Sequence, residues 1–424
     1  MAIIKQPSCD DPSEPALLPV TEARRRLAEL SGVVTETVEV ATALSANRVL
    51  RKSVVSPINV PSETNSAMDG YAIHQNDIPQ SGEATLRVVG EAFAGVKFSG
   101  QLQPGDAVRV FTGAVLPDGA DTVVIQEHVA LDGDTVTIDS SVQAGRNVRH
   151  AGEDLTIGQT VLEAGRQLSA ADVGLIASIG ITSVTVTRPV KVAFFSTGDE
   201  VHPLDKAGSE PLPEGMVYDS NRHTLRCLLQ ALHVDVIDLG IVRDTLEDTV
   251  NALKKASQVA DVIVSSGGIS AGEADYVTKA FHEVGEVSFW KLAMRPGRPL
   301  ASGKIGNATF FGLPGNPVAV MVTFLAFVQP SIKQHMGMTH TEPFAVPAVA
   351  KTDIKKSPGR TEYQRGIAAL SADGVMRVEL TGKQGAGRLS SMSAANCLIV
   401  LGDDVQSVAA GDPIVVWPFD GLLS

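Results

Sequence analysis

The feature that most constrains the fold is an alternation of strand-like and helix-like segments between residues 188 and 330. The strand-like segments read VKVAFFS, VDVIDLGIV, DVIVSS, VSFWKLAM and ATFFGL. The helix-like segments read SNRHTLRCLLQAL, with Asp219 or Ser220 as its cap, TLEDTVNALKKA, DYVTKAFHEVG and PVAVMVTFLAFV. Such alternation is typical of βαβ units and predicts a mostly parallel sheet. Right-handed crossovers then place every strand-to-helix loop at the same edge of that sheet.

The loops at this edge have an unusual content. Open α/β sheets bind their ligands outside the carboxyl ends of the strands, so we expect a site where these loops meet. In chain order the loops read STGDE (196–200), VRD (242–244), SSGGISAGEADY (265–276), KLAMRPGRP (291–299) and GLPGNP (312–317).

The GLPGNP loop has the composition of an anion-binding turn. Asn316 is a good helix cap and Pro317 suits the first helical position, so the helix would offer free amides to an anion. Gly312 and Gly315 allow a close backbone approach. Taken alone, the loop is more often an ordinary strand-to-helix turn than an anion site.

Two further loops also favour an anion. Gly267 and Gly268, after Ser266, give a weak phosphate-loop signal, and the Walker pattern is absent. Arg295 and Arg298 lie between prolines, and two guanidinium groups on a stiff loop suit a phosphate or another oxyanion. A solvated basic loop is the alternative interpretation.

Carboxylates accompany these basic loops. Glu200, Asp244 and Asp275 all end or follow strands at the same edge. Each alone suits a helix cap or a solvated loop, but a divalent cation such as Mg²⁺ is held by one or two carboxylates together with substrate phosphates. The three acids together therefore predict a metal site. A serine or cysteine nucleophile is disfavoured, because GxSxG is absent and no cysteine has a histidine partner by spacing.

The regions on either side of this α/β segment have different predicted secondary structures. TEARRRLAEL (21–30, capped by Thr21), ATALSANRVL (41–50) and LSAADVGLIASIG (168–180) predict helices, and the Asp69–Gly70 pair suggests a hairpin turn. A β-rich insertion between helical regions indicates one domain interrupted by another, and a small barrel or sandwich ends the chain. The expected architecture is α/β and multidomain. A discontinuous linker domain covers 19–52 and 158–187, and a β-rich insertion covers 53–157. An α/β domain follows at 188–335, and a C-terminal β domain at 341–424.

Composition excludes several classes of protein. The net charge of −13 disfavours nucleic acid and anionic lipid as partners, and aromatic residues make up only 4% of the chain. The longest apolar run, at 318–328, is too short to span a membrane. Cys9, Cys227 and Cys397 have no paired spacing and the N-terminus lacks a signal-peptide core, so we expect a cytoplasmic location.

The ordered set of motifs resembles one known family. NSAMDGYA, FTGAVLPDGAD, AGEDL, STGDE, YDSNR, SSGGISAGEADY, KLAMRPGRP, GLPGNP and QRG occur in the order seen in the molybdopterin molybdenumtransferase (MoeA) family, which includes the gephyrin E domain. The resemblance covers nearly the whole chain after residue 20. No single motif is decisive, but the ordered set is highly specific.

The resemblance implies an activity and an assembly. The activity is insertion of molybdate into adenylylated molybdopterin, with assistance from Mg²⁺ and release of AMP. The α/β domain would be MogA-like, and the protein would be an elongated homodimer of four-domain subunits. Each active site would lie between the α/β domain of one subunit and the β insertion of its partner. A transient contact with the molybdopterin adenylyltransferase is also implied.

The resemblance also implies site residues. Its functional positions correspond here to Asp69, Thr112, Asp154, Glu200, Asp244, Asp275, Lys291, Pro314, Pro317 and Arg365. Lys291, Arg295, Arg298 and Arg365 would hold phosphate and molybdate, while the three loop acids would hold Mg²⁺ or orient water.

Three departures from the family pattern stand out. Arg295 replaces a frequent lysine, and Ala386 replaces a serine that would donate a hydroxyl. Ser62-Glu63-Thr64 precedes NSAMDG where the family typically has Pro-Phe-Asp, which affects local packing more than chemistry.

Two other functions remain open at this stage. The first is adenylylation of molybdopterin, although the related domains usually carry GGTG where this chain reads GGIS and lack the surrounding β domains. The second is a non-enzymatic scaffold like gephyrin, although the acidic loop residues are present and no peptide groove is evident in the sequence.

Overall fold

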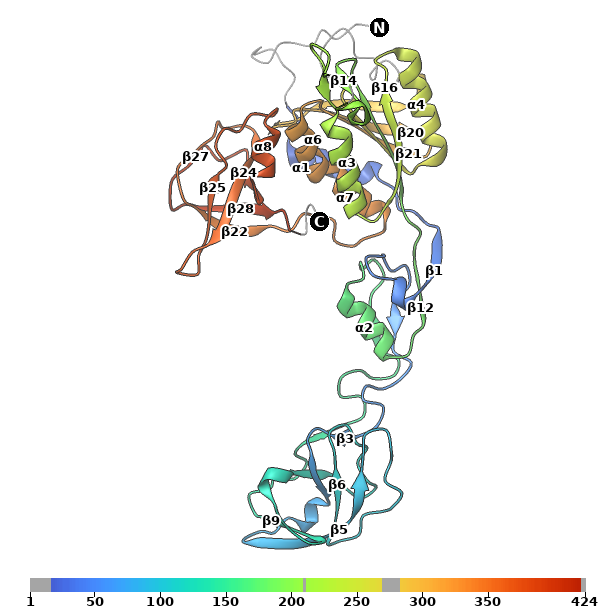
Figure 1. Cartoon of the computed structure of the whole chain (residues 1–424), viewed down its shortest axis with the longest axis vertical. Helices are drawn as coiled ribbons and strands as arrows, with labels where there is room; N and C mark the ends of the chain where they lie inside the picture. Colours follow the sequence, from blue (N-terminus) through green and yellow to red (C-terminus); the bar gives the residue numbers. More distant parts are fainter. Residues whose placement is uncertain (1–16, 209–210, 269–282, 421–424) are drawn as a thin grey trace.

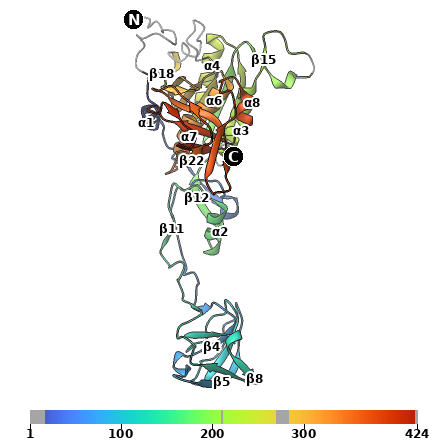
Figure 2. The ribbon, with the colours of Figure 1, turned by 90° about the vertical axis from the view of Figure 1, so that its left-hand side faces the viewer.

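The chain forms an elongated molecule with a large head, a narrow middle and a distant β-rich end (Figures 1 and 2). The computed structural model describes residues 17–208, 211–268 and 283–420. The head contains the α/β region and the C-terminal barrel side by side. Residues 37–187 leave the head and return to it, and they build the middle and the far end.

The head is organised around a six-stranded sheet in the order β16-β13-β17-β21-β20-β18. The first four strands are parallel, and β20 and β18 continue the sheet through antiparallel pairs. The mostly parallel sheet is therefore confirmed, with β20 as a strand that the sequence pattern missed. The strands are β13 (Lys191–Thr197), β16 (Asp235–Val242), β17 (Val262–Ser266), β18 (Glu286–Lys291), β20 (Pro299–Ile305) and β21 (Ala308–Leu313).

Helices flank this sheet and join the strands, as the alternation predicts. Asp219 caps α3, because its side chain accepts a hydrogen bond from the N–H of Arg222. The predicted helix over 317–328 runs on as α6, a π-helical segment and α7, and the helix predicted over 275–285 lies mostly outside the described residues. The helices are α1 (Val20–Leu30), α3 (Ser220–Ala231), α4 (Leu246–Val259), α6 (Pro317–Thr323), η5 (Phe324–Val328) and α7 (Gln329–His335).

The C-terminal region is a closed five-stranded barrel rather than a sandwich. Its strands pair in the order β24-β25-β22-β28-β26, and β26 pairs back with β24. Apolar residues of the barrel, including Tyr363 and Trp417, belong to the same core as helices α1, α3 and α6. The barrel is therefore packed firmly onto the α/β region. Its elements are β22 (Val346–Ala350), β23 (Ile354–Lys355), β24 (Thr361–Leu370), β25 (Met376–Leu380), α8 (Leu389–Ser393), β26 (Cys397–Leu401), β27 (Ser407–Val408) and β28 (Pro413–Pro418).

The narrow middle is a small unit with its own apolar core. A capping box between Ser169 and Asp172 starts α2, so the helix predicted over 168–180 is confirmed. The elements are β1 (Thr37–Ala41), η1 (Thr42–Leu44), β2 (Val54–Val55), β11 (Thr160–Leu162), α2 (Ala170–Ser178) and β12 (Ser183–Thr187).

Two predictions for the N-terminal segments are wrong. Thr21 does not cap α1, which begins one residue earlier, after Pro19, without a side-chain cap. Residues 41–50 do not form a helix beyond the short η1 turn, because Val49 and Leu50 make bridges to the strand segments around Gln167 and Val186 and bury there. Tertiary burial has overridden helix propensity at this position.

The distant end is a β-rich insertion around a sheet in the order β7-β4-β6-β5-β9-β8. The hairpin turn predicted at Asp69–Gly70 is wrong, since Gly70 starts β4 and β3 pairs with β10 instead. Gly70 is needed for another reason: a Cβ there would lie 2.0 Å from the carbonyl oxygen of Val124. The strands are β3 (Asn65–Ser66), β4 (Gly70–Ile73), β5 (Glu83–Ala92), β6 (Asp106–Val110), β7 (Thr122–Ile125), β8 (Ala130–Asp132), β9 (Thr135–Asp139) and β10 (Val148–Arg149).

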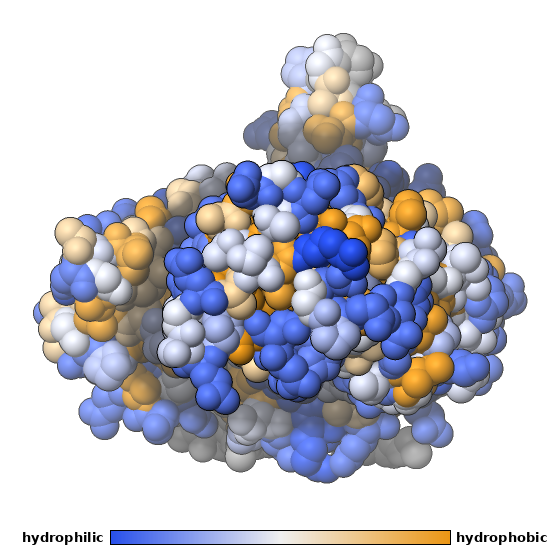
Figure 3. Space-filling view, turned by 90° about the horizontal axis from the view of Figure 1, so that it is seen from below, coloured by the Kyte–Doolittle hydropathy of each residue, from blue (hydrophilic) through white to orange (hydrophobic). Residues whose placement is uncertain are grey.

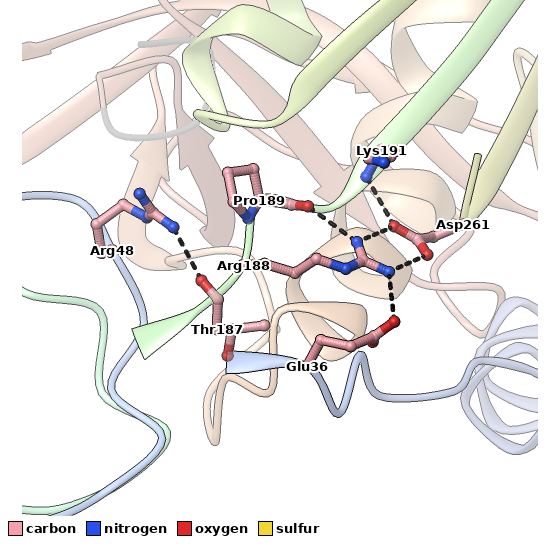
Figure 4. A network of polar contacts seen from close by, with 7 residues as sticks. All are labelled: Glu36, Arg48, Thr187, Arg188, Pro189, Lys191 and Asp261. Carbon is pink, nitrogen blue, oxygen red and sulfur yellow. Dashed lines mark hydrogen bonds and ion pairs between the residues drawn. The ribbon is translucent and has the colours of Figure 1, made fainter. Parts of the chain in front are cut away.

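An ion-pair network holds the head at the point where the chain returns from the middle (Figure 4). Arg188 donates from Nη1 and Nη2 to both carboxylate oxygens of Asp261, over 2.7 and 2.8 Å. Arg188 also contacts Glu36 of the outgoing segment at 3.4 Å, and the N–H of Lys191 donates to Asp261. One guanidinium therefore ties both crossing segments to the start of β17.

The surface is of mixed character. Seen from below, the molecule alternates hydrophilic and hydrophobic residues over its face (Figure 3). Among the described helices, none combines the length and the hydropathy that crossing a lipid bilayer requires.

Replacing Asp261 with Asn is predicted to lower the free energy of unfolding by about 1–3 kcal/mol at pH 7, because charge-assisted hydrogen bonds of this kind contribute that much. Burial alone would raise the pKa of Asp261, but hydrogen bonds from Arg188 and Lys191 outweigh it and hold the pKa below its usual range. The contribution is therefore complete above about pH 4 and lost as the pH falls further.

Denaturant unfolding of the wild type and Asp261→Asn between pH 3 and pH 7 tests this expectation. The difference between the two proteins should shrink below about pH 4. The control is Asp235→Asn, which removes an exposed carboxylate at the start of β16. A difference that stays constant over the whole pH range contradicts the prediction.

Candidate functional site

The carboxyl edge of the sheet opens into a cleft of about 1030 Å³. Its walls come from the ends of β13 and β17, the loops after β16, β18 and β21, and a glycine-rich loop of the barrel. The cleft gathers these residues that the sequence predicts: Glu200, Asp244, Ser266, Gly267, Gly268, Arg295, Arg298, Pro314, Gly315, Asn316 and Pro317. The expected convergence of the loops is thus present in the structure.

Hydrogen bonds and tight contacts hold these loops together. Asn221, near the start of α3, donates from Nδ2 to Ser266 Oγ over 2.9 Å and to the carbonyl of Gly315 over 2.8 Å. Gly267 has φ +93°, and a Cβ there would lie 2.6 Å from the carbonyl oxygen of Thr197. The floor of the cleft therefore requires glycine at this position.

The GLPGNP loop departs from the expected anion-binding turn. Pro317 does occupy the first helical position, and Asn316 takes the cap position without a side-chain hydrogen bond. The N–H of Val318, however, donates to the carbonyl of Ala386 over 3.1 Å. This amide is bonded to the barrel rather than free for an anion, so the prediction of free amides is wrong for Val318.

A smaller chamber of about 400 Å³ adjoins the cleft and contains Arg365. The two cavities share Arg295, Pro296 and Gln384 as lining residues. Arg295 reaches this position because β19 (Met294–Arg295) pairs in parallel with β24, opposite Glu362. The loop after β18 is therefore fixed to the barrel strand that carries Arg365.

Arg365 is a buried cation, with only 1% of its surface exposed. It donates to Ser391 Oγ and to the carbonyl of Gly385, both over 3.1 Å, and within the described residues no carboxylate forms an ion pair with it. Burial, and then the positive charge of Arg295, lower the pKa of Arg365 to about 10. A buried cation of this kind is stabilised when an anion enters the chamber.

The acidic residues divide between the cleft and other places. Glu200 and the half-buried Asp244 line the cleft, whereas Asp275 lies outside the described residues. Over the described ranges, no three acidic, histidine or cysteine side chains gather as a metal would need. Lys291 ends β18 and lines neither cavity.

The predicted residues of the insertion form a separate group. Asp69 accepts hydrogen bonds from the N–H and the hydroxyl of Thr112, each over 2.8 Å, and these bonds hold the pKa of Asp69 below its usual range. Asp154 is exposed where the insertion meets the middle unit. Within one chain this group lies far from the cleft, since the insertion stands at the opposite end of the molecule (Figures 1 and 2).

Several lining residues were not predicted as site residues. Thr197 and Tyr218 lie in or beside quoted motifs, STGDE and YDSNR, but neither shows a chemical signal by itself. Gln384 and Gly385 come from the barrel, well beyond the strand ends in the sequence, and no periodicity links the two regions.

The fold and the cleft together define a class of protein. It is a multidomain α/β protein with a cleft at the carboxyl edge of a mostly parallel sheet. Arg295 and Arg298 line this cleft, and a loop of the C-terminal barrel forms part of its wall.

Comparison with known proteins identifies the family. Three family models match the chain: the MoeA N-terminal region (domains I and II) at 18–180, a probable molybdopterin binding domain at 193–334 and the MoeA C-terminal region (domain IV) at 347–419. The chain belongs to the MoeA family of molybdopterin molybdenumtransferases.

Individual relatives agree with this assignment. A molybdopterin molybdenumtransferase of Haemophilus influenzae is 41% identical over 96% of this chain and 100% of its own length. One from Nostoc is 35% identical over 89% of this chain and 88% of its own. The crystal structure of a molybdopterin biosynthesis MoeA protein from Pyrococcus horikoshii superposes with a TM-score of 0.82 at 27% identity, covering 94% of this chain and 99% of that one.

Arg365→Met is predicted to abolish binding of a tetrahedral oxyanion such as sulfate while leaving the fold intact. The substitution removes a buried cation without a carboxylate partner, so the free energy of unfolding should fall by less than about 1 kcal/mol or rise. Calorimetric titration with sulfate and thermal unfolding measure the two effects.

The matched control is Arg377→Met, which removes a surface arginine paired with Asp373 in the same barrel. It should leave sulfate affinity unchanged. Unchanged sulfate affinity in Arg365→Met contradicts the assignment. So does an Arg365→Met protein that fails to fold, if added sulfate also fails to raise the unfolding temperature of the wild type.

Proposed function

We propose that this chain inserts molybdate into adenylylated molybdopterin and releases AMP. The observation that carries the proposal is the pair of joined cavities, with Arg295 shared between them and Arg365 buried in the smaller one. The relatives that cover nearly the whole chain are named molybdopterin molybdenumtransferases, which supports the same activity. Both substrates are anions, and the basic residues lie where two anions would meet.

Each cavity suits one substrate. The chamber of about 400 Å³ accommodates a tetrahedral oxyanion, which would take hydrogen bonds from Arg365 and Arg295. The cleft of about 1030 Å³ accommodates a nucleotide-sized molecule, with Arg298 beside its phosphates. In this proposal the dithiolene end of the substrate would lie next to the oxyanion, and positioning of that kind lowers the barrier to their reaction.

Release of AMP requires charge stabilisation at the departing phosphate. Arg295 and Arg298 supply positive charge on a loop that β19 holds in place. Glu200 and Asp244 fit Mg²⁺, since this ion is held by one or two carboxylates and otherwise by phosphates and water. Bound there, Mg²⁺ would polarise the pyrophosphate and stabilise charge on the leaving AMP.

The insertion contributes through the partner subunit in this proposal. Asp69 and Thr112 are exposed and pre-oriented by their mutual hydrogen bonds, yet their own cleft is at the far end of the chain. A homodimer with antiparallel arms would bring them to the partner's cleft, because a twofold interface exchanges equivalent surfaces. We further propose a cytoplasmic location and a transient contact with the enzyme that adenylylates molybdopterin.

The function is tested with purified protein, adenylylated molybdopterin and molybdate. AMP release should depend on molybdate and match the cofactor formed, and the gene should restore nitrate reductase activity to a strain that lacks this step. Consumption of ATP with transfer of AMP to molybdopterin would instead establish an adenylyltransferase. Failure in both assays would favour a non-enzymatic scaffold.

Two single variants, Asp69→Asn and Glu200→Gln, are each predicted to lose nearly all activity. Co-expression of the two variants should restore about a quarter of the total wild-type activity. Half of the dimers are then mixed, and one of the two sites in each mixed dimer is intact. Asp132→Asn, an exposed carboxylate elsewhere in the insertion, is the control and should remain active.

This experiment separates the two possible positions of Asp69. Activity that stays absent in the mixed dimers would place Asp69 in the cleft of its own subunit, whereas near wild-type activity of Asp69→Asn alone would place it outside the reaction. Asp275→Asn, in the SSGGISAGEADY motif, is expected to lose activity as Glu200→Gln does, and near wild-type activity would exclude that role.

A further inference from the structure

One wall of the cleft has no part in the scheme above, and it includes an aromatic side chain. Tyr218 ends β15 (Val217–Tyr218) and is the single aromatic residue among the described residues that line the cleft. The residue is 37% exposed, and the ring of His202 meets its ring edge-on, with the ring centroids 5.9 Å apart and an interplanar angle of 62°. The histidine supports the tyrosine and leaves ring surface open to the cleft.

The floor below this wall carries polar oxygens that lack hydrogen-bond partners. Thr197 and Asp219, with 4% and 5% of their surfaces exposed, line the cleft. Within the described residues, Thr197 Oγ1, Asp219 Oδ2 and Asn221 Oδ1 are buried without any hydrogen-bond partner. Orphaned groups of this kind cost free energy and are uncommon in folded proteins, so each calls for an explanation.

The local structure explains why these oxygens are available. Asp219 uses Oδ1 to cap α3 and to accept from Ser196 Oγ over 3.2 Å, which leaves Oδ2 unused. The Asn221 side-chain amide donates its N–H groups to Ser266 Oγ and to the carbonyl of Gly315, which leaves its carbonyl oxygen without a partner. The same contacts that build the cleft therefore fix unused acceptors in its floor.

The pattern of groups specifies the chemistry of a ligand. A carboxylate and an amide carbonyl accept hydrogen bonds only, and a hydroxyl can accept as well, so the floor needs a ligand edge rich in N–H donors. Tyr218 offers a face on which a flat ring can stack. The basic residues Arg295 and Arg298 stand elsewhere in the same cleft, so the ligand also carries phosphate.

We propose that Thr197, Tyr218, Asp219 and Asn221 form the subsite for the pterin ring of the substrate, an inference that rests on the proposed function. The 2-amino group and the adjacent ring N–H of a pterin present two neighbouring donors, which the unused acceptors Asp219 Oδ2 and Asn221 Oδ1 would take up. The corresponding edge of adenine places a ring acceptor beside its amino group, and a carboxylate repels that acceptor.

Asp219→Asn tests the proposal without removing the helix cap, because Asn caps helices as well as Asp does. The variant replaces an acceptor with an amide and loses the charge that pairs with the pterin donors. We expect at least a tenfold rise in KM for adenylylated molybdopterin with little change in kcat. Binding of 6-hydroxymethylpterin, followed by its fluorescence, should weaken similarly, and AMP affinity should stay within twofold.

Two further variants sharpen the result. Tyr218→Ala should raise the same KM through lost stacking, whereas Tyr218→Phe should retain wild-type KM. Asp248→Asn, an exposed acid in the first turn of α4, is the charge-matched control and should behave as the wild type. Circular dichroism confirms that each variant is folded.

Three outcomes would overturn the proposal. They are an unchanged KM in Asp219→Asn, a loss of AMP affinity with pterin affinity intact, or equal effects from Asp248→Asn. The second outcome would assign the subsite to adenine. Failure of the proposed function would give a different result. The wild-type protein would then form no cofactor with molybdate, although its binding of 6-hydroxymethylpterin would still depend on Asp219.

Discussion

The pairing of β19 with β24 is the contact on which the site depends. It fixes the loop after β18 to a barrel strand and thereby places Arg295 beside the chamber of Arg365. Lys355, Asp353 and Glu362 also line this chamber. Burial and the positive charge of Arg295 nevertheless both disfavour the charged form of Arg365, which an anion would stabilise. The shared apolar core of barrel and α/β region resists their separation. An oxyanion bound in this chamber would therefore stabilise the buried positive charge of Arg365.

The rest of the molecule serves this head from a distance. The middle unit and the insertion have separate cores, and the network around Arg188 and Asp261 is one of the contacts that join them to the head (Figure 4). The insertion presents a pre-oriented Asp69 far from its own cleft, which is understandable if a second subunit supplies the cleft. Catalysis would then depend on the angle of the arm as well as on the chemistry of the loops.

The sequence predicted those features that follow from periodicity and topology. Glu200, Asp244, Arg295 and the GLPGNP loop meet in one cleft because strand–helix alternation sends their loops to one edge. Contributions of the barrel, such as Gln384 and the carbonyl of Ala386, could not be predicted, because only tertiary packing brings them there. Local signals also failed where burial or close backbone contact decided the structure, as at residues 41–50 and at Gly70.

The central claim is that the oxyanion substrate occupies the chamber between Arg295 and Arg365. Anomalous diffraction at the molybdenum absorption edge, from crystals of the full chain grown with molybdate, tests it directly. The account predicts one strong anomalous peak within hydrogen-bond distance of the Arg365 guanidinium, and its loss in Arg365→Met. A molybdenum peak elsewhere in the cleft, with the Arg365 chamber empty of molybdenum, would contradict the account.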